Sequence, residues 1–252
     1  IQFKKLIMGT SKSFSALTKK MPNWPAFSST VTRSCDGSQL SKEKGIEILS
    51  GYVTAIGGAT KAGRGDSGVA GRSGIRTAIK LGGFFDAFIG SGGKVKEALK
   101  SIGFADFTDK SVADIINHLI EYSAGPSSTI DDKAAKEASR LLLEEIAGTA
   151  NSIEELEAVL NHVFEKLTHE ELIIKYFGYY ILEHLSIWFY EKLVKDKGKN
   201  ECTGLFRQIK DFIFESLRGV NKNRPLQNIK WGTEESDTLI KNIQQDVLTV
   251  FE

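Results

Sequence analysis

Hydrophobic residues recur every three to four positions through residues 104–252, the spacing that places them on one face of an α-helix. Several of these stretches begin with a hydroxyl side chain followed three residues later by an acid, a combination that caps the first turn of a helix. The pairs are Ser111 with Asp114, Ser152 with Glu155, and Thr168 with Glu171. Gly148 follows a further periodic stretch, at a position where helices commonly end. The pattern predicts a C-terminal helical bundle.

Residues 172–194 are the most hydrophobic part of this half of the chain, but Lys175, Glu183 and His184 interrupt them. Charged groups inside a membrane-spanning helix are costly, so we expect a buried core helix and no membrane span. No stretch of the sequence alternates hydrophobic and polar residues as a strand does. The predicted fold class is therefore mainly α. The last stretch, residues 233–251, is expected to place Leu239, Ile243, Val247 and Val250 on one helix face.

Residues 45–103 hold most of the chain's 24 glycines. Glycine at this density indicates loops or close approach of backbones. Hydrophobic residues between Val69 and Phe88 nevertheless keep a partial three-to-four spacing, which indicates helices. We predict a glycine-rich helical region whose small residues allow tight packing, with breaks at the glycine pairs.

Residues 1–44 are polar and small, and they carry Pro22 and Pro25. Lysine and arginine outnumber acids here, so the segment is locally basic. It shows no sustained periodicity, and we predict a flexible N-terminal arm in which Trp24 and Phe27 anchor onto a partner or onto the body of the protein. The predicted organisation is thus an arm over residues 1–44, a glycine-rich region over 45–103 and a helical domain over 104–252.

Composition and charge restrict the function classes. The 252-residue chain is 41% hydrophobic and 26% charged, with a formal net charge of +1, as expected of a soluble globular protein. That charge does not by itself call for nucleic acid or an anionic membrane as a partner. Cys35 and Cys202 are far apart and outside any C-x-x-C motif, which favours a reducing cytoplasm and gives no zinc site.

The motifs typical of enzymes are weak or absent. Residues 63–68, GRGDSG, match a dinucleotide-binding pattern, but no convincing strand precedes them. Neither an α/β-hydrolase nucleophile elbow nor a catalytic Cys/His signature is present. We therefore expect no enzyme activity, no catalytic residue, no metal and no intrinsic cofactor. The histidines lack the spacing of a metal site and are interpreted as partly exposed helix residues: His118, His162, His169 and His184.

Four cations lie among the glycines and form a possible phosphate-contacting stripe: Arg64, Arg72, Arg76 and Lys80. A nucleic-acid-binding module would use such a stripe, with affinity that falls steeply as salt rises. A solvated helix face explains the same residues, and the sequence leaves both interpretations open.

Met8 and Gly9 resemble the start of a chain, although seven residues precede them. Met8 is an ordinary internal residue in one interpretation. In a second, Gly9 becomes the terminus and is myristoylated, with Ser13 completing the motif and Lys12 supplying basic charge, which gives an acylated, membrane-associated protein. In a third, another enzyme acts on the free glycine amine. The last two require removal of residues 1–8.

Particular stretches resemble the QatB family, the B component of bacterial Qat anti-phage defence systems. They are MGTSKSF at residues 8–14, MPNWP at 21–25, and the longer stretches 68–88 and 111–146. The similarity extends from residue 8 to about residue 218, and the tail over 219–252 shows no clear match. Systems of this family combine the B component with an ATPase (QatA type), a QueC-like enzyme (QatC type) and a TatD-like nuclease (QatD type).

The resemblance implies a non-enzymatic component that works through these partners. QueC-like enzymes activate the carboxylate of a 7-deazaguanine with ATP. If the acceptor is the amine of Gly9, the product is a 7-deazaguanine amide on the protein terminus. The resemblance thus predicts an adaptor and modification substrate, with its helical body on the ATPase. The expected recognition residues for the QueC-like enzyme are Thr10, Ser11, Lys12, Ser13 and Trp24.

Overall fold

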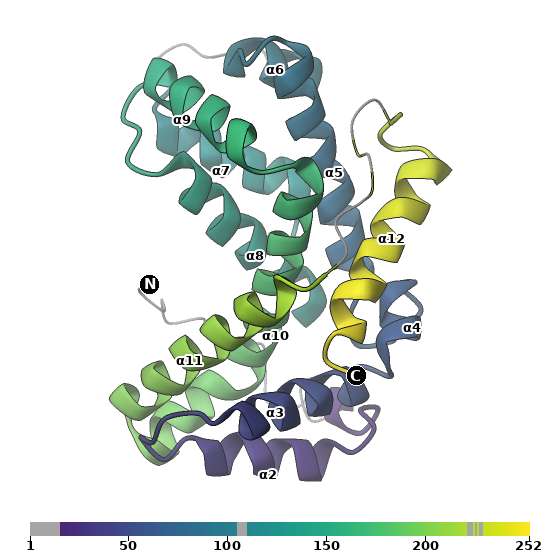
Figure 1. The fold of residues 1–252 in the computed structure, drawn as a ribbon, viewed down its shortest axis with the longest axis vertical. Coiled ribbons are helices and arrows are strands. Elements are labelled where there is room, and N and C mark those ends of the chain that lie inside the picture. Colours follow the sequence, from purple (N-terminus) through teal and green to yellow (C-terminus); the bar gives the residue numbers. More distant parts are fainter. Residues whose placement is uncertain (1–15, 105–109, 221–223, 225, 227–228) are drawn as a thin grey trace.

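A computed structural model describes residues 16–104, 110–220, 224, 226 and 229–252, and all of its labelled elements are helices (Figure 1). The predicted mainly α fold class is confirmed. The first helices are α2 (Trp24–Ser34), α3 (Lys42–Ala55), α4 (Ala59–Gly63), α5 (Arg72–Gly90) and α6 (Val95–Ser101). They are followed by α7 (Val112–Ala124), α8 (Ile130–Ala147), α9 (Ile153–Lys166), α10 (His169–Lys197), α11 (Lys199–Leu217) and α12 (Glu234–Thr249).

Helix α10 is the centre of the molecule, and it packs against α8, α11, α5 and α12 (Figure 1). It is 29 residues long and buried on nearly all sides from His169 to Phe189. Burial raises the pKa of Glu183 in this helix to about 8, so that side chain is largely uncharged at neutral pH. The expectation of a core helix over residues 172–194 is confirmed. Within the described residues, no helix has the length and hydropathy needed to cross a membrane.

The predicted helix starts are confirmed. Ser111 with Asp114 and Thr168 with Glu171 form complete capping boxes, and the Ser152 side chain accepts a hydrogen bond from the Glu155 amide. Helix α8 ends at Gly148, as expected. The predicted face of the last helix needs one correction. Helix α12 ends at Thr249, so Val250 turns outward and is 42% exposed, while Ile243 and Val247 are buried.

The glycine-rich region forms closely packed helices. A Cβ added at Gly82 would lie 2.1 Å from the Trp231 ring, and one added at Gly63 would lie 2.6 Å from Gln245 Cβ of α12. The chain breaks at Gly57 and Gly58, between α3 and α4, where both residues have positive φ. It does not break at Gly82 and Gly83, contrary to the expectation for glycine pairs. These two glycines lie within α5, where their missing side chains make room for Trp231.

Residues 1–44 are not an extended arm throughout. Helix α2 begins at Trp24 with Pro25 in its first turn, a position where proline fits a helix, and it buries Phe27 and Val31. Residues 1–15 lie outside the described residues. One hydrophobic core includes side chains of all three predicted segments, from Met21 to Phe251. The division of the chain at residues 44 and 103 stays a prediction from composition.

Candidate functional site

A network of buried polar groups lies where α8, α5 and α10 meet. Asp131, in the first turn of α8, accepts hydrogen bonds from the amides of Ser73 at 2.9 Å and Gly71 at 3.3 Å, and so caps the start of α5. The Tyr180 hydroxyl donates to the same carboxylate. Burial acts to raise the pKa of Asp131, but nearby His184 and the hydrogen bonds from Tyr180 and Ser73 outweigh it and hold the pKa below its usual value.

The network continues into α10 and α3 through His184, which is fully buried. Its Nε2 atom lies 3.4 Å from Asp131 Oδ1, and its Nδ1 atom lies 2.8 Å from the Tyr52 hydroxyl. The imidazole also stacks on Trp188, with ring centroids 5.3 Å apart. Burial raises the pKa of Tyr52 well above its usual value, so this phenol stays protonated.

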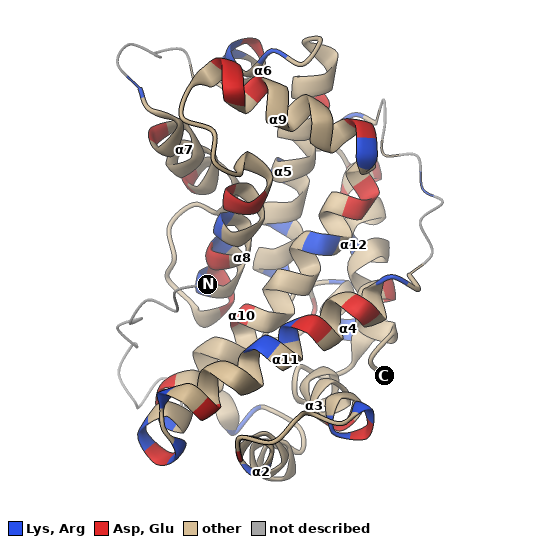
Figure 2. Cartoon of the chain, turned by 60° about the vertical axis from the view of Figure 1, so that its left-hand side comes forward, with Lys and Arg blue, Asp and Glu red and all other residues tan. Residues whose placement is uncertain are grey.

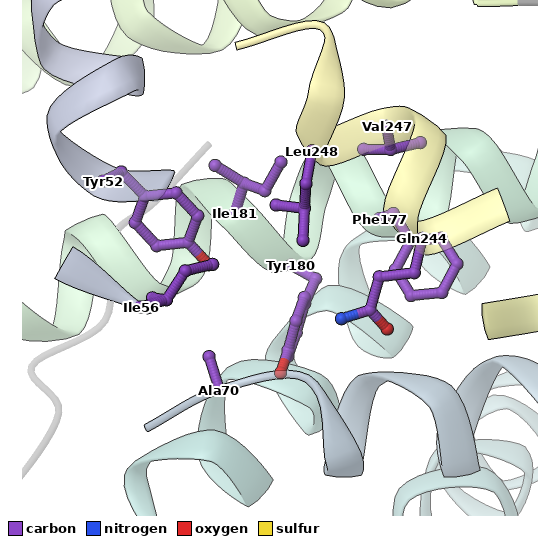
Figure 3. Close-up of a pocket in the computed structure, with 9 residues that line it drawn as sticks. All are labelled: Tyr52, Ile56, Ala70, Phe177, Tyr180, Ile181, Gln244, Val247 and Leu248. Carbon is purple, nitrogen blue, oxygen red and sulfur yellow. The ribbon is translucent and has the colours of Figure 1, made fainter. Parts of the chain in front are cut away.

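A histidine between a carboxylate and a hydroxyl can serve acid–base chemistry if substrate reaches it. The cavity next to this group is apolar and too narrow to admit a water molecule (Figure 3). His184 itself is fully buried, and we interpret the network as structural. The lining residues are Tyr52, Ile56, Ala70, Phe177, Tyr180, Ile181, Gln244, Val247 and Leu248.

The four histidines differ in burial, although the sequence predicts partial exposure for all of them. His118 is partly exposed and stacks on Phe104, and His162 lies near Glu165 on the surface, as predicted. His169 and His184 are buried, which corrects the expectation that they are partly exposed. No group of three or more His, Cys, Asp or Glu side chains within the described residues could hold a metal ion.

The fold places only three of the four cations of the predicted basic stripe on one helix. Arg72, Arg76 and Lys80 follow one another at four-residue intervals on α5, whereas Arg64 lies at the end of α4. Figure 2 shows acidic residues interspersed with the basic ones over the helices of that view.

Two of these cations make contacts within the fold. Arg76 donates to Asp132 at 2.9 Å, and Lys80 donates to the Tyr122 carbonyl at 2.9 Å. Both contacts join α5 to the corner between α7 and α8. Arg64 and Arg72 are exposed. The nucleic-acid hypothesis stays a prediction, and the fold explains half of the stripe without it.

The predicted modification site, Gly9, and the recognition residues Thr10, Ser11, Lys12 and Ser13 lie outside the described residues. The first residue that the structure describes is Ala16, seven positions after Gly9. Seven residues of fully extended chain span at most about 25 Å.

The base of this N-terminal segment is held firmly. Met21 is buried, and the Trp24 ring stacks on Phe189 of α10 with centroids 5.2 Å apart. Trp24 also meets the edges of Trp188 and Phe27. The structure therefore places Trp24 as an anchor on the body, one of the two roles expected for it. Contact of Trp24 with a partner stays a prediction.

The chain matches the family model described as Qat anti-phage system associated protein QatB over residues 57–251. Comparisons with curated proteins and with solved structures found no match. The matched residues include α4 to α12 and the Asp131 network. They also include the tail beyond residue 218, for which the sequence showed no clear resemblance, and they begin after the N-terminal stretches that did.

Proposed function

The chain belongs to the QatB family and is a component of the Qat anti-phage system, and on this premise we propose that it presents its N-terminal segment as a modification substrate. In this proposal the helical body is an adaptor with no catalytic activity of its own. A QueC-like enzyme of the system modifies the amine of Gly9. The ATPase and the TatD-like nuclease are the further partners.

The observation that carries the proposal is the anchoring of α2. Trp24 and Phe27 fix this helix on Phe189 of α10, so the chain leading to Gly9 departs from a rigid base. A short tether on a rigid base keeps the terminus near any enzyme bound to the same body, which raises its effective concentration there. The match to residues 57–251 supports the body as the family's shared part.

The proposed chemistry needs a free amine. The enzyme converts the 7-deazaguanine carboxylate and ATP into an acyl adenylate and pyrophosphate. The neutral amine of Gly9 attacks the acyl carbon, AMP leaves, and an amide forms while the amine loses a proton. An α-amine has a pKa near 8, so a useful fraction is neutral at physiological pH. Glycine suits this step because it lacks a side chain that would hinder entry into a pocket.

The exposed hydrophobic residues bear on how the ATPase and the nuclease bind the helical body. Among the described residues, the exposed large hydrophobics are Ile46 on α3, Ile89 on α5 and Val250 after α12. They lie on three different elements, whereas a permanent interface usually has one large continuous apolar patch. We therefore propose that the ATPase and nuclease are bound through mainly polar, reversible contacts.

The proposal is tested by phage protection in cells that carry the complete system with Gly9→Ala. The added methyl group leaves a terminal amine but obstructs a pocket shaped for glycine, and protection is expected to fall strongly. Gly90→Ala is the matched control, because a Cβ at Gly90 meets nothing within 4 Å. Full protection by the Gly9→Ala variant, and by a chain lacking residues 1–15, would contradict the proposal.

A further inference from the structure

The chain's only two cysteines are distant in sequence and adjacent in space. Cys35 follows the last residue of α2, and Cys202 lies in the first turn of α11. The segments that carry them lie together, since a Cβ added at Gly37 would lie 3.7 Å from Glu201 Cγ, and each thiol affects the pKa of the other. Both residues are buried, at 1% and 0% exposure, and Cys202 Sγ also lies 3.6 Å from the Tyr190 carbonyl oxygen. Two free, buried thiols on neighbouring segments are a starting arrangement for a disulfide.

The backbone around the pair is fixed by contacts that do not involve sulfur. The Gln208 side chain of α11 accepts a hydrogen bond from the Leu40 amide and donates to the Ser38 carbonyl at 3.3 Å. These bonds hold the loop after Cys35 on the same helix that carries Cys202. A bond between the sulfurs would therefore join elements that already lie together.

A solvent-open cavity of about 220 Å³ lies beside the thiols. Its lining includes Ser34 and Gly37, which flank Cys35 closely in sequence, and Glu201, which precedes Cys202. Ser38, Asn200 and Gln208 also line it, so it is suited to water and to small polar solutes. Neither cysteine lines the cavity, so a small oxidant that enters it has still to pass the wall residues beside the buried pair.

We propose that Cys35 and Cys202 are a redox-sensitive pair that hydrogen peroxide converts into a disulfide linking α2 to α11. The Cys35 thiolate attacks one peroxide oxygen, the O–O bond breaks, and a sulfenic acid and water form once a proton is taken up. The Cys202 thiol then attacks the sulfenic sulfur. The S–S bond forms, the S–O bond breaks and a second water leaves, so two thiols and one peroxide give one disulfide and two waters.

The order of attack follows from the surroundings of the thiols. Burial raises the pKa of Cys202 to about 12. Burial also raises the pKa of Cys35, but Lys197 at the end of α10 opposes the rise, while Glu201 and Asp36 add to it. Cys35 is therefore the readier nucleophile. Because little of the Cys35 thiol is ionised at neutral pH, its oxidation is slow there. While the pH stays below the thiol pKa, the rate rises about tenfold for each unit by which the pH is raised.

The disulfide would act on the helix from which the N-terminal segment departs. A cross-link between residues 35 and 202 closes most of the chain into one loop and reduces the entropy of the unfolded state. It also prevents α2 from lifting away from α11. The inference concerns the described thiols alone and does not depend on modification of Gly9.

The full-length chain is incubated with hydrogen peroxide at pH 7 and pH 8, and its thiols are counted after denaturation. We expect both thiols to be lost together, a cross-linked peptide pair joining Cys35 to Cys202, and a rise in melting temperature that dithiothreitol reverses. The rate at pH 8 should be about ten times that at pH 7. Retention of both thiols, or cross-links only between separate chains, would overturn the proposal.

Single variants give the control. In Cys202→Ser the Cys35 sulfenic acid has no resolving thiol, so dimedone added together with denaturant should trap it, and the melting temperature of the oxidised chain should not rise. In Cys35→Ser the remaining Cys202 should react far more slowly. If either variant folds poorly, the cross-linked peptide of the unmodified chain still decides the matter. Equal dimedone trapping in the unmodified chain would show that no disulfide forms.

Discussion

Asp131 and Asp132 are adjacent in sequence but cap different helices. Asp131 accepts from Gly71 and Ser73 at the start of α5, whereas Asp132 accepts from Thr129 at the start of its own helix and pairs with Arg76. Acids in the first turn of a helix are expected from local chemistry, because the N-terminal end of the helix dipole is positive. The sequence did not show that Asp131 serves a helix some sixty residues earlier, because that contact exists only after α5 and α8 pack.

Replacement of Asp131 by asparagine should destabilise the protein at neutral pH and have much less effect in acid. The folded state holds the pKa of Asp131 below its unfolded value, so the stabilisation is present above about pH 4 and is lost as the pH falls through the folded pKa. The expected loss is about 2 kcal/mol at pH 7, because buried donors lose their charged acceptor. Urea unfolding at pH 7 and pH 3 measures it.

Asp237→Asn is the matched control for this experiment, since Asp237 forms a partly exposed pair with Lys241 on α12. Such a pair contributes at most about 1 kcal/mol. Equal destabilisation by Asp131→Asn at the two pH values would show that the carboxylate charge does not contribute as described.

At the scale of elements, α5 depends on glycines for its position in the fold. The helix passes through Gly82 and Gly83 without a break. The Trp231 side chain, just before α12, lies against these two glycines, in space that larger side chains would fill. The sequence predicted tight packing of small residues in this region. It did not identify the partner, since Trp231 is distant in sequence and the stretch around it has no helical pattern.

Gly82→Ala should destabilise the protein by about 1–3 kcal/mol, the usual cost of overfilling a packed contact. Its Cβ would lie 2.1 Å from the Trp231 ring, so the indole must shift and its fluorescence should change. Gly204→Ala on α11 is the control, because a Cβ there meets nothing within 4 Å, and it should be neutral or gain up to about 1 kcal/mol. Similar behaviour of the two variants in chemical denaturation would contradict this account of α5.

Local signals explain which helices the sequence predicted and which it missed. Helices α7, α9 and α10 begin at side chains that cap their own amides, so three or four consecutive residues are enough to find them. Helix α2 has no side-chain cap at Asn23, and its prolines resemble those of an extended segment. It is stabilised by aromatic contacts with α10, and such contacts are not visible in sequence.

At the scale of the molecule, helices from distant parts of the chain share one core around α10, and the family match covers most of that core. Composition and periodicity predicted its class, but the function came from resemblance, because a helical bundle by itself indicates no activity. The buried His184 network shows the same limit, since a carboxylate, a histidine and a hydroxyl group meet there beside a cavity too narrow for a water molecule.

Mass spectrometry of the intact chain and of its N-terminal peptide tests the central claim most directly. The chain is expressed alone and together with the other Qat components, with and without the QueC-like enzyme. We expect a chain that begins at Gly9 and carries the added mass of a 7-deazaguanine amide, only when that enzyme is present. A chain with an unmodified N-terminus, purified from a complex that protects cells against phage, would contradict it.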